Sequence, residues 1–273
     1  MKSAPAAGLL LLALILASFA AACQSGPAGY ASNESAIQLN ERGMTMYEQG
    51  AYDKAVLNFD RALELDPDNP AIHFNKGQAL DGMRKFEQAI ESYDMAVKLD
   101  PKFTDAWCSK GLSYYDLGKL DKAMENVDKA ISIDGNNARA WSVKGLVYIE
   151  LQKYSEAVGA LDKATGLDPE DVDLWSRKAY AQVKAAQYEN ALRSADKAIS
   201  IDKNNSLAWG YKGKALHELR RYDEALIAYD KALGLEPENP ALWYSKGLSL
   251  ETLNRDAEAK KCYDKARSLG YTF

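Results

Sequence analysis

The chain has 273 residues, of which 47% are hydrophobic and 27% are charged, and this excludes a disordered, collagen-like or multi-spanning membrane protein. The net charge of −5 disfavours broad nucleic-acid binding, which needs a basic face to neutralise phosphates. Three cysteines and two histidines leave little material for a disulfide framework or a histidine metal site. We therefore expect no metal, no cofactor and no nucleic-acid partner.

Residues 1–22 have the features of an export signal peptide. Lys2 is the only charged residue before Glu34, and an apolar run centred on residues 9–16 follows it. Small residues then lead directly into Cys23, an arrangement that resembles a lipobox, in which the cysteine is lipidated and becomes the new N-terminus. The match is imperfect, because the lipobox prefers Leu where Ala20 stands. Cleavage by an ordinary signal peptidase and an uncleaved membrane anchor are the two alternatives.

The segment 23–35 is rich in Gly, Ser and Ala, a composition that is typical of a flexible tether. Together the two segments predict an exported protein that is anchored to a membrane through its N-terminus. Lipidation at Cys23 or an uncleaved anchor would hold the remaining chain at the extracytoplasmic face. Ordinary cleavage would instead release it.

A 34-residue period runs from residue 36 to residue 273. One slot holds glycine in six repeats, and Ala179 occupies this slot in the remaining repeat. The glycines are Gly43, Gly77, Gly111, Gly145, Gly213 and Gly247. All five tryptophans stand four residues before this slot, at Trp107, Trp141, Trp175, Trp209 and Trp243. The register predicts seven repeats: 36–69, 70–103, 104–137, 138–171, 172–205, 206–239 and 240–273.

The succession of Trp, Gly, Tyr, Ala, an aromatic residue, Ala and Pro resembles the tetratricopeptide repeat family over residues 36–273. The resemblance implies an all-α fold, a right-handed α-solenoid of seven helix-turn-helix repeats. The residues also favour two helices in each repeat, because apolar and small residues recur at helical spacing in two runs. Gly in the first helix and Ala in the second let the two backbones approach closely, and the aromatic residues fill the space around them.

Local signals predict where the helices begin and end. We expect a first helix of about fourteen residues, as over 105–118, and a polar N-cap for each second helix, as at Asp53 or Asp121. Asp–Pro pairs such as Asp66 with Pro67 end the second helix, since Pro cannot continue it. Asn69 and Asn239, each before a Pro, are predicted to cap the first helices that follow.

The last repeat differs from the others at two second-helix positions. Lys260 and Arg267 stand where the six preceding repeats have uncharged, mostly apolar residues. Polar terminal faces are what a finite solenoid requires. We therefore expect a monomer, with no filament and no missing eighth repeat.

A cation precedes every glycine slot, and an acid stands in every second helix. The cations are Arg42, Lys76, Lys110, Lys144, Lys178, Lys212 and Lys246, and the acids are Asp60, Asp94, Asp128, Asp162, Asp196, Asp230 and Asp264. Direct contact across helices is predicted, because a partly buried lysine needs a partner. Since both terminal repeats keep both members, the pattern slightly favours pairing within a repeat. The alternative is that both positions are solvated surface charges.

No constellation for catalysis is present, and the chain is predicted not to be an enzyme. His73 and His217 lie four repeats apart, as do Cys108 and Cys262, so neither pair shares a site. The glycines belong to the repeat register and form no phosphate-binding loop.

In the tetratricopeptide repeat family the first helices form most of the concave wall, so this wall is the candidate binding groove. Position by position, the apolar stripe that results consists of Leu112, Tyr115, Leu146, Ile149, Tyr180 and Val183, with acidic residues beside it. Such a stripe predicts a groove for a protein or peptide partner of unknown identity. The alternative is that the superhelix turns the stripe into contacts between repeats.

The predicted function is thus a non-catalytic interaction scaffold at the outer face of a membrane. A structural or spacer protein with no groove ligand is the alternative. Repeat 172–205 is predicted to be the softest, because several of its packing positions hold small or polar residues. These residues are Ala179, Gln182, Ala185 and Ala195.

Overall fold

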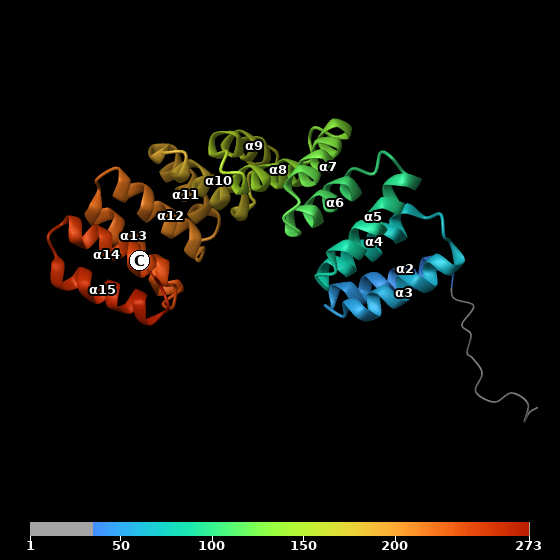
Figure 1. The fold of residues 1–273 in the computed structure, drawn as a ribbon, viewed down its shortest axis with the longest axis horizontal. Helices are drawn as coiled ribbons and strands as arrows, with labels where there is room; N and C mark the ends of the chain where they lie inside the picture. Colours follow the sequence, from blue (N-terminus) through green and yellow to red (C-terminus); the bar gives the residue numbers. More distant parts are fainter. Residues whose placement is uncertain (1–34, 273) are drawn as a thin grey trace, which may run out of the picture. The chain divides into compact units, whose positions relative to one another are not determined.

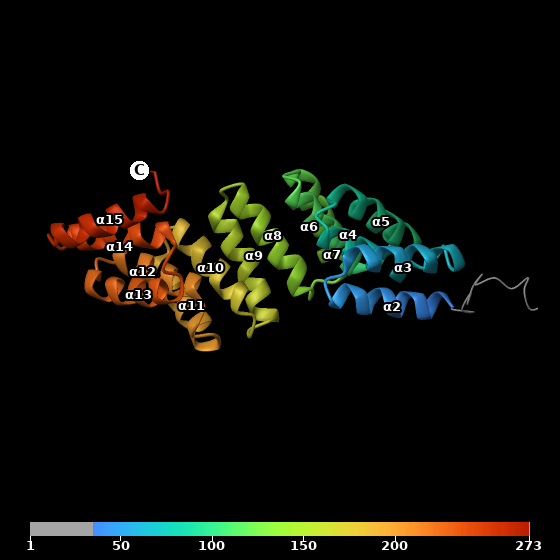
Figure 2. The same ribbon diagram turned by 90° about the horizontal axis from the view of Figure 1, so that it is seen from below.

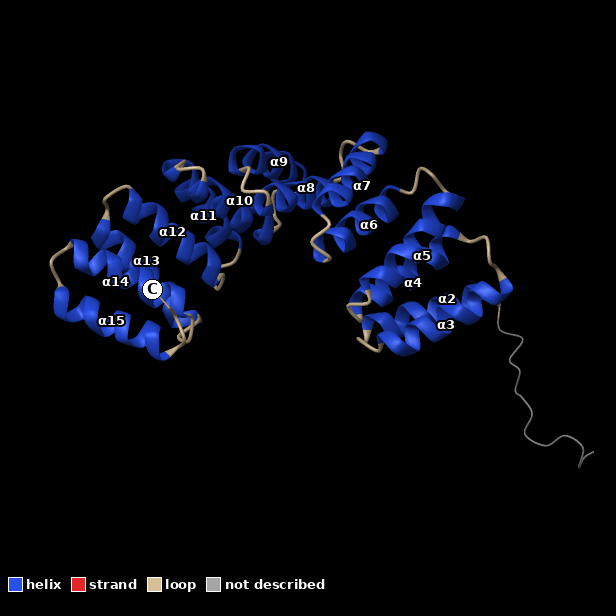
Figure 3. Ribbon diagram, viewed as in Figure 1, coloured by secondary structure: helices blue, strands red, loops and turns tan. Residues whose placement is uncertain are grey.

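The computed structural model describes residues 35–272, which contain fourteen α-helices and no strand (Figure 3). The helices are α2 (Ala36–Glu48), α3 (Tyr52–Leu65), α4 (Pro70–Gly82), α5 (Phe86–Leu99), α6 (Thr104–Asp116), α7 (Leu120–Ile133), α8 (Ala138–Glu150), α9 (Tyr154–Leu167), α10 (Val172–Lys184), α11 (Tyr188–Ile201), α12 (Ser206–Glu218), α13 (Tyr222–Leu235), α14 (Pro240–Thr252) and α15 (Asp256–Ser268). The predicted signal peptide, most of the tether and Cys23 lie outside the described residues. Within the described residues, no helix is both long and apolar enough to span a membrane.

The chain divides into two compact bodies, one ending at Pro67 and the other comprising Asp68–Phe273. The described part of the first body is the hairpin α2–α3, whose two helices lie side by side (Figure 2). The second body contains α4–α15 as six successive helical hairpins, each packed on the next (Figure 1).

The first helix of each hairpin begins at a fixed interval of the sequence. The starting residues are Ala36, Pro70, Thr104, Ala138, Val172, Ser206 and Pro240, one every 34 residues. The prediction of an all-α repeat solenoid is confirmed.

Side chains cap the first helices, as predicted at the two Asn–Pro pairs. The Asn69 side chain accepts a hydrogen bond from the Ala71 amide at 3.1 Å, and Asn239 does the same for Ala241. The prediction of polar N-caps for the second helices is wrong. α3 and α7 begin one residue before Asp53 and Asp121, and the capping positions make no side-chain hydrogen bond. The two acids instead lie in the first turn, where their negative charge interacts favourably with the positive end of the helix dipole.

Each turn between the two helices of a hairpin contains one residue in the left-handed conformation. Gly50 and Gly118 have φ values of 73° and 69°. The other five turns use Arg84, Gln152, Ala186, Arg220 and Asn254, with φ between 56° and 62°. The predicted helix 105–118 therefore ends earlier, at Asp116, because Gly118 reverses the chain.

The repeated glycines face large buried side chains from the second helix of the same hairpin. A Cβ atom at Gly77 would lie 2.5 Å from Tyr93 Cε1, and one at Gly145 would lie 2.8 Å from Leu161 Cγ. Tyr93 and Leu161 are fully buried. The aromatic or aliphatic residue thus fills the space that the missing side chain leaves, which refines the predicted contact between backbones.

The predicted contact between the repeated cations and acids is confirmed, but the preference for pairing within a repeat is wrong. Each Lys–Asp pair joins a first helix to the second helix of the preceding repeat. In the second body these pairs are Lys110–Asp94, Lys144–Asp128, Lys178–Asp162, Lys212–Asp196 and Lys246–Asp230, with N···O distances of 2.5–2.8 Å. Each of these lysines also lies over the tryptophan ring of its own helix, 4.4–5.7 Å from the centroid. The pairs therefore stabilise the stacking of repeats.

The two charged positions of the last repeat are exposed. Lys260 and Arg267 lie on the surface of α15, whereas their counterparts Ile90 and Val97 on α5 are each only 7% exposed. The uncharged residues at these positions thus serve packing between successive repeats.

Candidate functional site

The first helices of the second body form a layer of their own. Direct contacts join α4 to α6, α6 to α8, α10 to α12 and α12 to α14, whereas neighbouring second helices approach one another less closely. In a stack of hairpins the layer with the closer spacing lies on the inner side of the curve. The candidate groove residues all come from this layer, on α6, α8 and α10.

Half of the predicted stripe packs between repeats. Leu112 contacts a buried cluster that includes Val127 and Val143, and Ile149 contacts one that includes Ala181 of the next repeat. Val183 is only 6% exposed and packs with Ala191 and Ala215. The alternative considered from the sequence, that the stripe turns partly into contacts between repeats, therefore holds for Leu112, Ile149 and Val183.

The other three stripe residues are half-buried, as Leu112 and Ile149 also are. The Tyr115 hydroxyl donates a hydrogen bond to Glu150 Oε1 at 3.2 Å, and burial together with Glu150 raises the pKa of Tyr115 to about 12. Leu146 on α8 occupies the same repeat position as Leu112 and Tyr180. The ring of Tyr180 lies 5.5 Å from that of Tyr211 on the next first helix.

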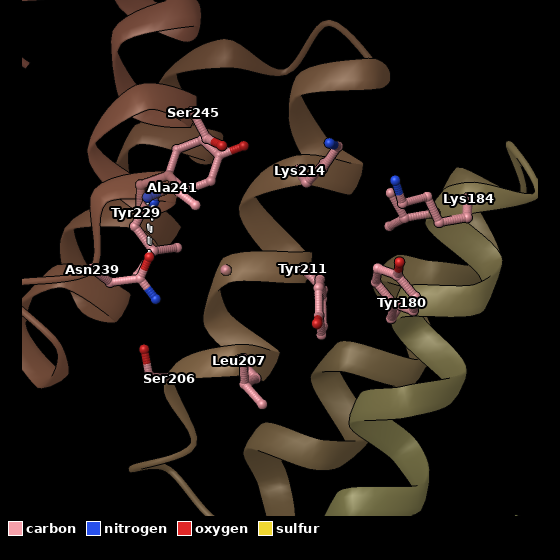
Figure 4. Close-up of a pocket in the computed structure, with 13 residues that line it drawn as sticks. Tyr180, Lys184, Ser206, Leu207, Tyr211, Lys214, Tyr229, Asn239, Ala241 and Ser245 are labelled. Atoms are coloured by element: carbon pink, nitrogen blue, oxygen red, sulfur yellow. Dashed lines mark hydrogen bonds between the residues drawn. The ribbon is translucent and has the colours of Figure 1, made fainter. Parts of the chain in front are cut away.

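Beside Tyr180 the inner layer opens into a hollow between α10, α12 and α14 (Figure 4). It encloses about 250 Å³. Its lining consists of Tyr180, Val183, Lys184, Ser206, Leu207, Gly210, Tyr211, Lys214, Tyr229, Asn239, Ala241, Leu242 and Ser245. We call this feature the α10–α12–α14 hollow. It contains two residues of the predicted stripe.

Gly210 lets the side chain of Leu242 pack closely against α12 in the wall of this hollow. A Cβ atom at this position would lie 2.9 Å from Leu242 Cδ2, so any side chain here would enter the wall between α12 and α14. The same repeat position holds a side chain in every other repeat, among them Ser176 and Tyr244. Gly210 is not part of the predicted stripe, although its departure from the repeat pattern is visible in the sequence.

Lysines are the only charged side chains that line the hollow. Lys184 and Lys214 are both exposed, and Figure 4 shows them on the same side of it, beyond the facing rings of Tyr180 and Tyr211. The Lys184 Nζ atom lies 5.7 Å from the centroid of Tyr180. Burial raises the pKa of Tyr211, and Tyr180 adds to this effect. The site is therefore an apolar hollow with a cationic rim.

Two polar contacts between neighbouring first helices occupy equivalent repeat positions. Asp81 accepts hydrogen bonds from the Tyr93 hydroxyl at 2.7 Å and from Ser113 Oγ at 2.8 Å. In the last two repeats His217 Nδ1 lies 2.9 Å from Ser249 Oγ. Burial raises the pKa of Asp81 and lowers that of His217. Both contacts are satisfied within the fold, which favours a structural role.

Other reactive groups occupy packed positions. Burial raises the pKa of the Cys108 thiol to about 11 and also raises that of Cys262, so neither sulfur is an activated nucleophile. Within residues 35–272, no three His, Cys, Asp or Glu side chains are grouped to hold a metal ion.

Comparison with family models finds tetratricopeptide repeats along much of the chain. A model described as TPR repeat matches residues 43–82, and models described as Tetratricopeptide repeat match 142–206, 206–239 and 240–269. A model of anaphase-promoting complex, cyclosome, subunit 3 matches residues 82–164. Among curated proteins, none matches.

Several solved structures share the fold. YrrB, described as a TPR protein with an unusual peptide-binding site, is 23% identical over 66% of this chain and 93% of its own, with a TM-score of 0.58. A tetratricopeptide repeat protein from Parabacteroides merdae is 20% identical over 88% and 95% of the two chains, with a TM-score of 0.64. A chain of the APC/C hetero-tetramer Cut9–Hcn1 is 17% identical over 86% of this chain and 46% of its own, with a TM-score of 0.66. At these identities the likeness concerns the fold alone.

Proposed function

Because the chain belongs to the tetratricopeptide repeat family, we propose that it is a non-catalytic protein–protein interaction scaffold. The observation that carries the proposal is the inner layer, where half-buried Leu146 and Tyr180 lead to the α10–α12–α14 hollow. A concave apolar surface with a few polar groups is what an extended peptide or a partner helix needs. The partner segment lies along this layer.

We further propose that the scaffold is tethered to a membrane at its extracytoplasmic face. The support comes from the sequence alone, namely Lys2, the apolar run and the small residues before Cys23. Mass spectrometry of the native N-terminus tests the tether. A diacylated Cys23 supports it, whereas an intact Met1 refutes cleavage and an unmodified N-terminus after residue 22 refutes lipidation.

A spacer protein without a groove ligand is the second candidate. It is favoured by the packing of Leu112, Ile149 and Val183 between repeats, because these residues need no partner to bury their side chains. In that case the stripe serves stacking, and the chain sets a distance from the membrane.

Substitution of the half-buried stripe separates the two candidates. The double variant Leu146→Glu with Tyr180→Glu places two charges on the inner layer, so a scaffold loses capture of its partner from native extracts. Leu167→Glu is the matched control, since Leu167 is 39% exposed on the second helix α9, away from this layer. Circular dichroism must show unchanged folding for both variants. Equal capture by the wild type, the double variant and the control would favour the spacer.

A further inference from the structure

Three departures from the repeat pattern meet at the α10–α12–α14 hollow. At the position of Gly210 the other repeats carry Asn40, Phe74, Cys108, Ser142, Ser176 and Tyr244. At the position of Lys184 they carry Glu48, Gly82, Asp116, Glu150, Glu218 and Thr252. At the position of Lys214 they carry Met44, Gln78, Leu112, Leu146, Tyr180 and Leu248. Gly210 is thus the only residue without a side chain at its repeat position. Lys184 and Lys214 are each the only lysine or arginine at theirs.

Stacking of repeats does not explain the two lysines. Lys184 and Lys214 are exposed and take no part in the Lys–Asp pairs that join the repeats. Gly210 differs from them, because its missing side chain lets Leu242 of the next repeat approach α12 closely. A ligand that carries negative charge gives the two lysines a common reason.

The hollow has the size and lining for one large apolar side chain. A cavity of about 150 Å³ with apolar walls binds benzene, so a hollow of about 250 Å³ is large enough for a phenyl ring. The wall that a ring would contact is formed by Tyr180, Val183, Tyr211 and Leu242, with Gly210 at its base. Aromatic side chains are effective anchors in such sites because they bury much area with few rotatable bonds.

The charge of the rim indicates what lies next to this anchor. The two lysines lie on one side of the hollow (Figure 4), and no carboxylate is among the residues that line it. A basic segment would be repelled there, whereas an acidic segment would form charge-assisted contacts with both ammonium groups.

Building on the scaffold function above, we propose that the hollow binds an acidic segment of a partner protein. One aromatic side chain of the segment enters the hollow between Tyr180, Tyr211 and Leu242. Neighbouring Asp or Glu residues of the segment contact Lys184 and Lys214. The hollow is thus the anchor point of the inner layer, and it selects its partner by the combination of one ring with adjacent negative charge.

A defined peptide tests both parts of this proposal with the purified full chain. The probe is a fluorescein-labelled, C-terminally amidated peptide with one Phe flanked on each side by Glu. We expect its fluorescence anisotropy to rise on binding, and its affinity to fall by about tenfold or more when Phe is replaced by Gly or Glu by Lys. Added salt must also weaken binding, because the rim charges are exposed. Equal binding of the three peptides would overturn the proposal.

Protein variants then locate the binding site. Gly210→Ser places a Cβ atom 2.9 Å from Leu242 Cδ2, so Leu242 must shift and the wall of the hollow changes. Lys184→Glu with Lys214→Glu reverses the rim charge and leaves the wall intact. Both variants must bind the probe at least about tenfold more weakly. Lys260→Glu, a charge reversal at an exposed residue that does not line the hollow, must bind normally. If Gly210→Ser and the double lysine variant both bind the probe with wild-type affinity, the hollow is not the binding site.

A failure of the proposed hollow can be distinguished from a failure of the scaffold function. Leu146 lies on α8 and does not line the hollow. Loss of partner capture in Leu146→Glu together with normal capture in Gly210→Ser and the lysine variant would refute the hollow as the anchor and leave the scaffold intact. Normal capture in every variant would refute both.

Discussion

Five of the seven hairpin turns have a residue other than glycine in the left-handed conformation, and Ala186 is the least suited of them. Ala has no side-chain polar group to compensate the close contact of its Cβ with the backbone. We expect Ala186→Gly to stabilise the protein by about 0.5–1 kcal/mol, the left-handed penalty less the entropy of glycine. The midpoint of urea denaturation measures this gain. Asn254→Gly should gain less, because Asn tolerates this conformation, and equal gains would contradict the explanation.

Asp81 and His217 occupy the same repeat position, but burial shifts their pKa values in opposite senses. Because the pKa of Asp81 is raised, the folded state binds its proton more tightly than the unfolded state, so this residue costs stability as the pH rises through that range. Because the pKa of His217 is lowered, the folded state loses stability as the pH falls from about 6.5 through the lowered value.

We therefore expect opposite pH dependences when the two residues are replaced by neutral side chains. The melting temperature of Asp81→Asn should rise relative to that of the wild type as the pH is raised above about 4. That of His217→Gln should rise relative to the wild type as the pH is lowered below about 6.5. If the differences in melting temperature between the variants and the wild type do not vary with pH, protonation of neither group is coupled to folding.

At the scale of the helical hairpin, two glycines of repeat 138–171 give a matched test of packing. A Cβ atom at Gly145 would lie 2.8 Å from Leu161 Cγ, whereas one at Gly159 meets nothing within 4 Å. We expect Gly145→Ala to destabilise by about 1–3 kcal/mol through overpacking. Gly159→Ala should stabilise by about 0.5–1 kcal/mol, because Ala favours an exposed helical position. Chemical denaturation of both variants measures these changes in stability. A loss of stability in Gly159→Ala would contradict this explanation.

The hairpins were predictable because their signals are local and recur. Asn69 with Pro70 starts a helix and Asp66 with Pro67 ends one, whatever the rest of the chain does. The partner of each repeated lysine was not predictable in this way. Asp94 could meet Lys76 or Lys110, and since both choices recur with the same period, only the packing of hairpins distinguishes them.

The candidate site was only partly predictable. Tyr180 was identified because first helices line the inner layer in this family. The hollow beside it depends on side-chain volumes from three repeats, namely the absent side chain at Gly210 and the positions of Tyr211 and Leu242. The burial of Val183 likewise depends on how closely α10 approaches α12. A periodic pattern places residues on a face of a helix, but it does not give the distance to the next repeat.

At the scale of the whole molecule, repeat 172–205 differs from its neighbours in its packing. Ala179 and Ala195 are fully buried at the positions where the repeat 206–239 has Gly213 and Tyr229. Gln182 is 4% exposed, and its Oε1 atom has no hydrogen-bond partner among the described residues.

These observations predict that repeat 172–205 is the point at which the solenoid opens most easily. An unpaired buried amide oxygen weakens a packed site, and in a solenoid a weak repeat lowers the local cost of opening. α10 also lies farther from α8 than from α12. We expect the amides of α10 and α11 to exchange with solvent faster than those of α8, α9, α12 and α13, as followed by mass spectrometry. Gln182→Tyr, which restores the side chain of Tyr148, should slow this exchange. If the wild-type α10 and α11 exchange no faster than their neighbours, the repeat is not a flexing point, and the inner layer must receive its partner as a preformed surface.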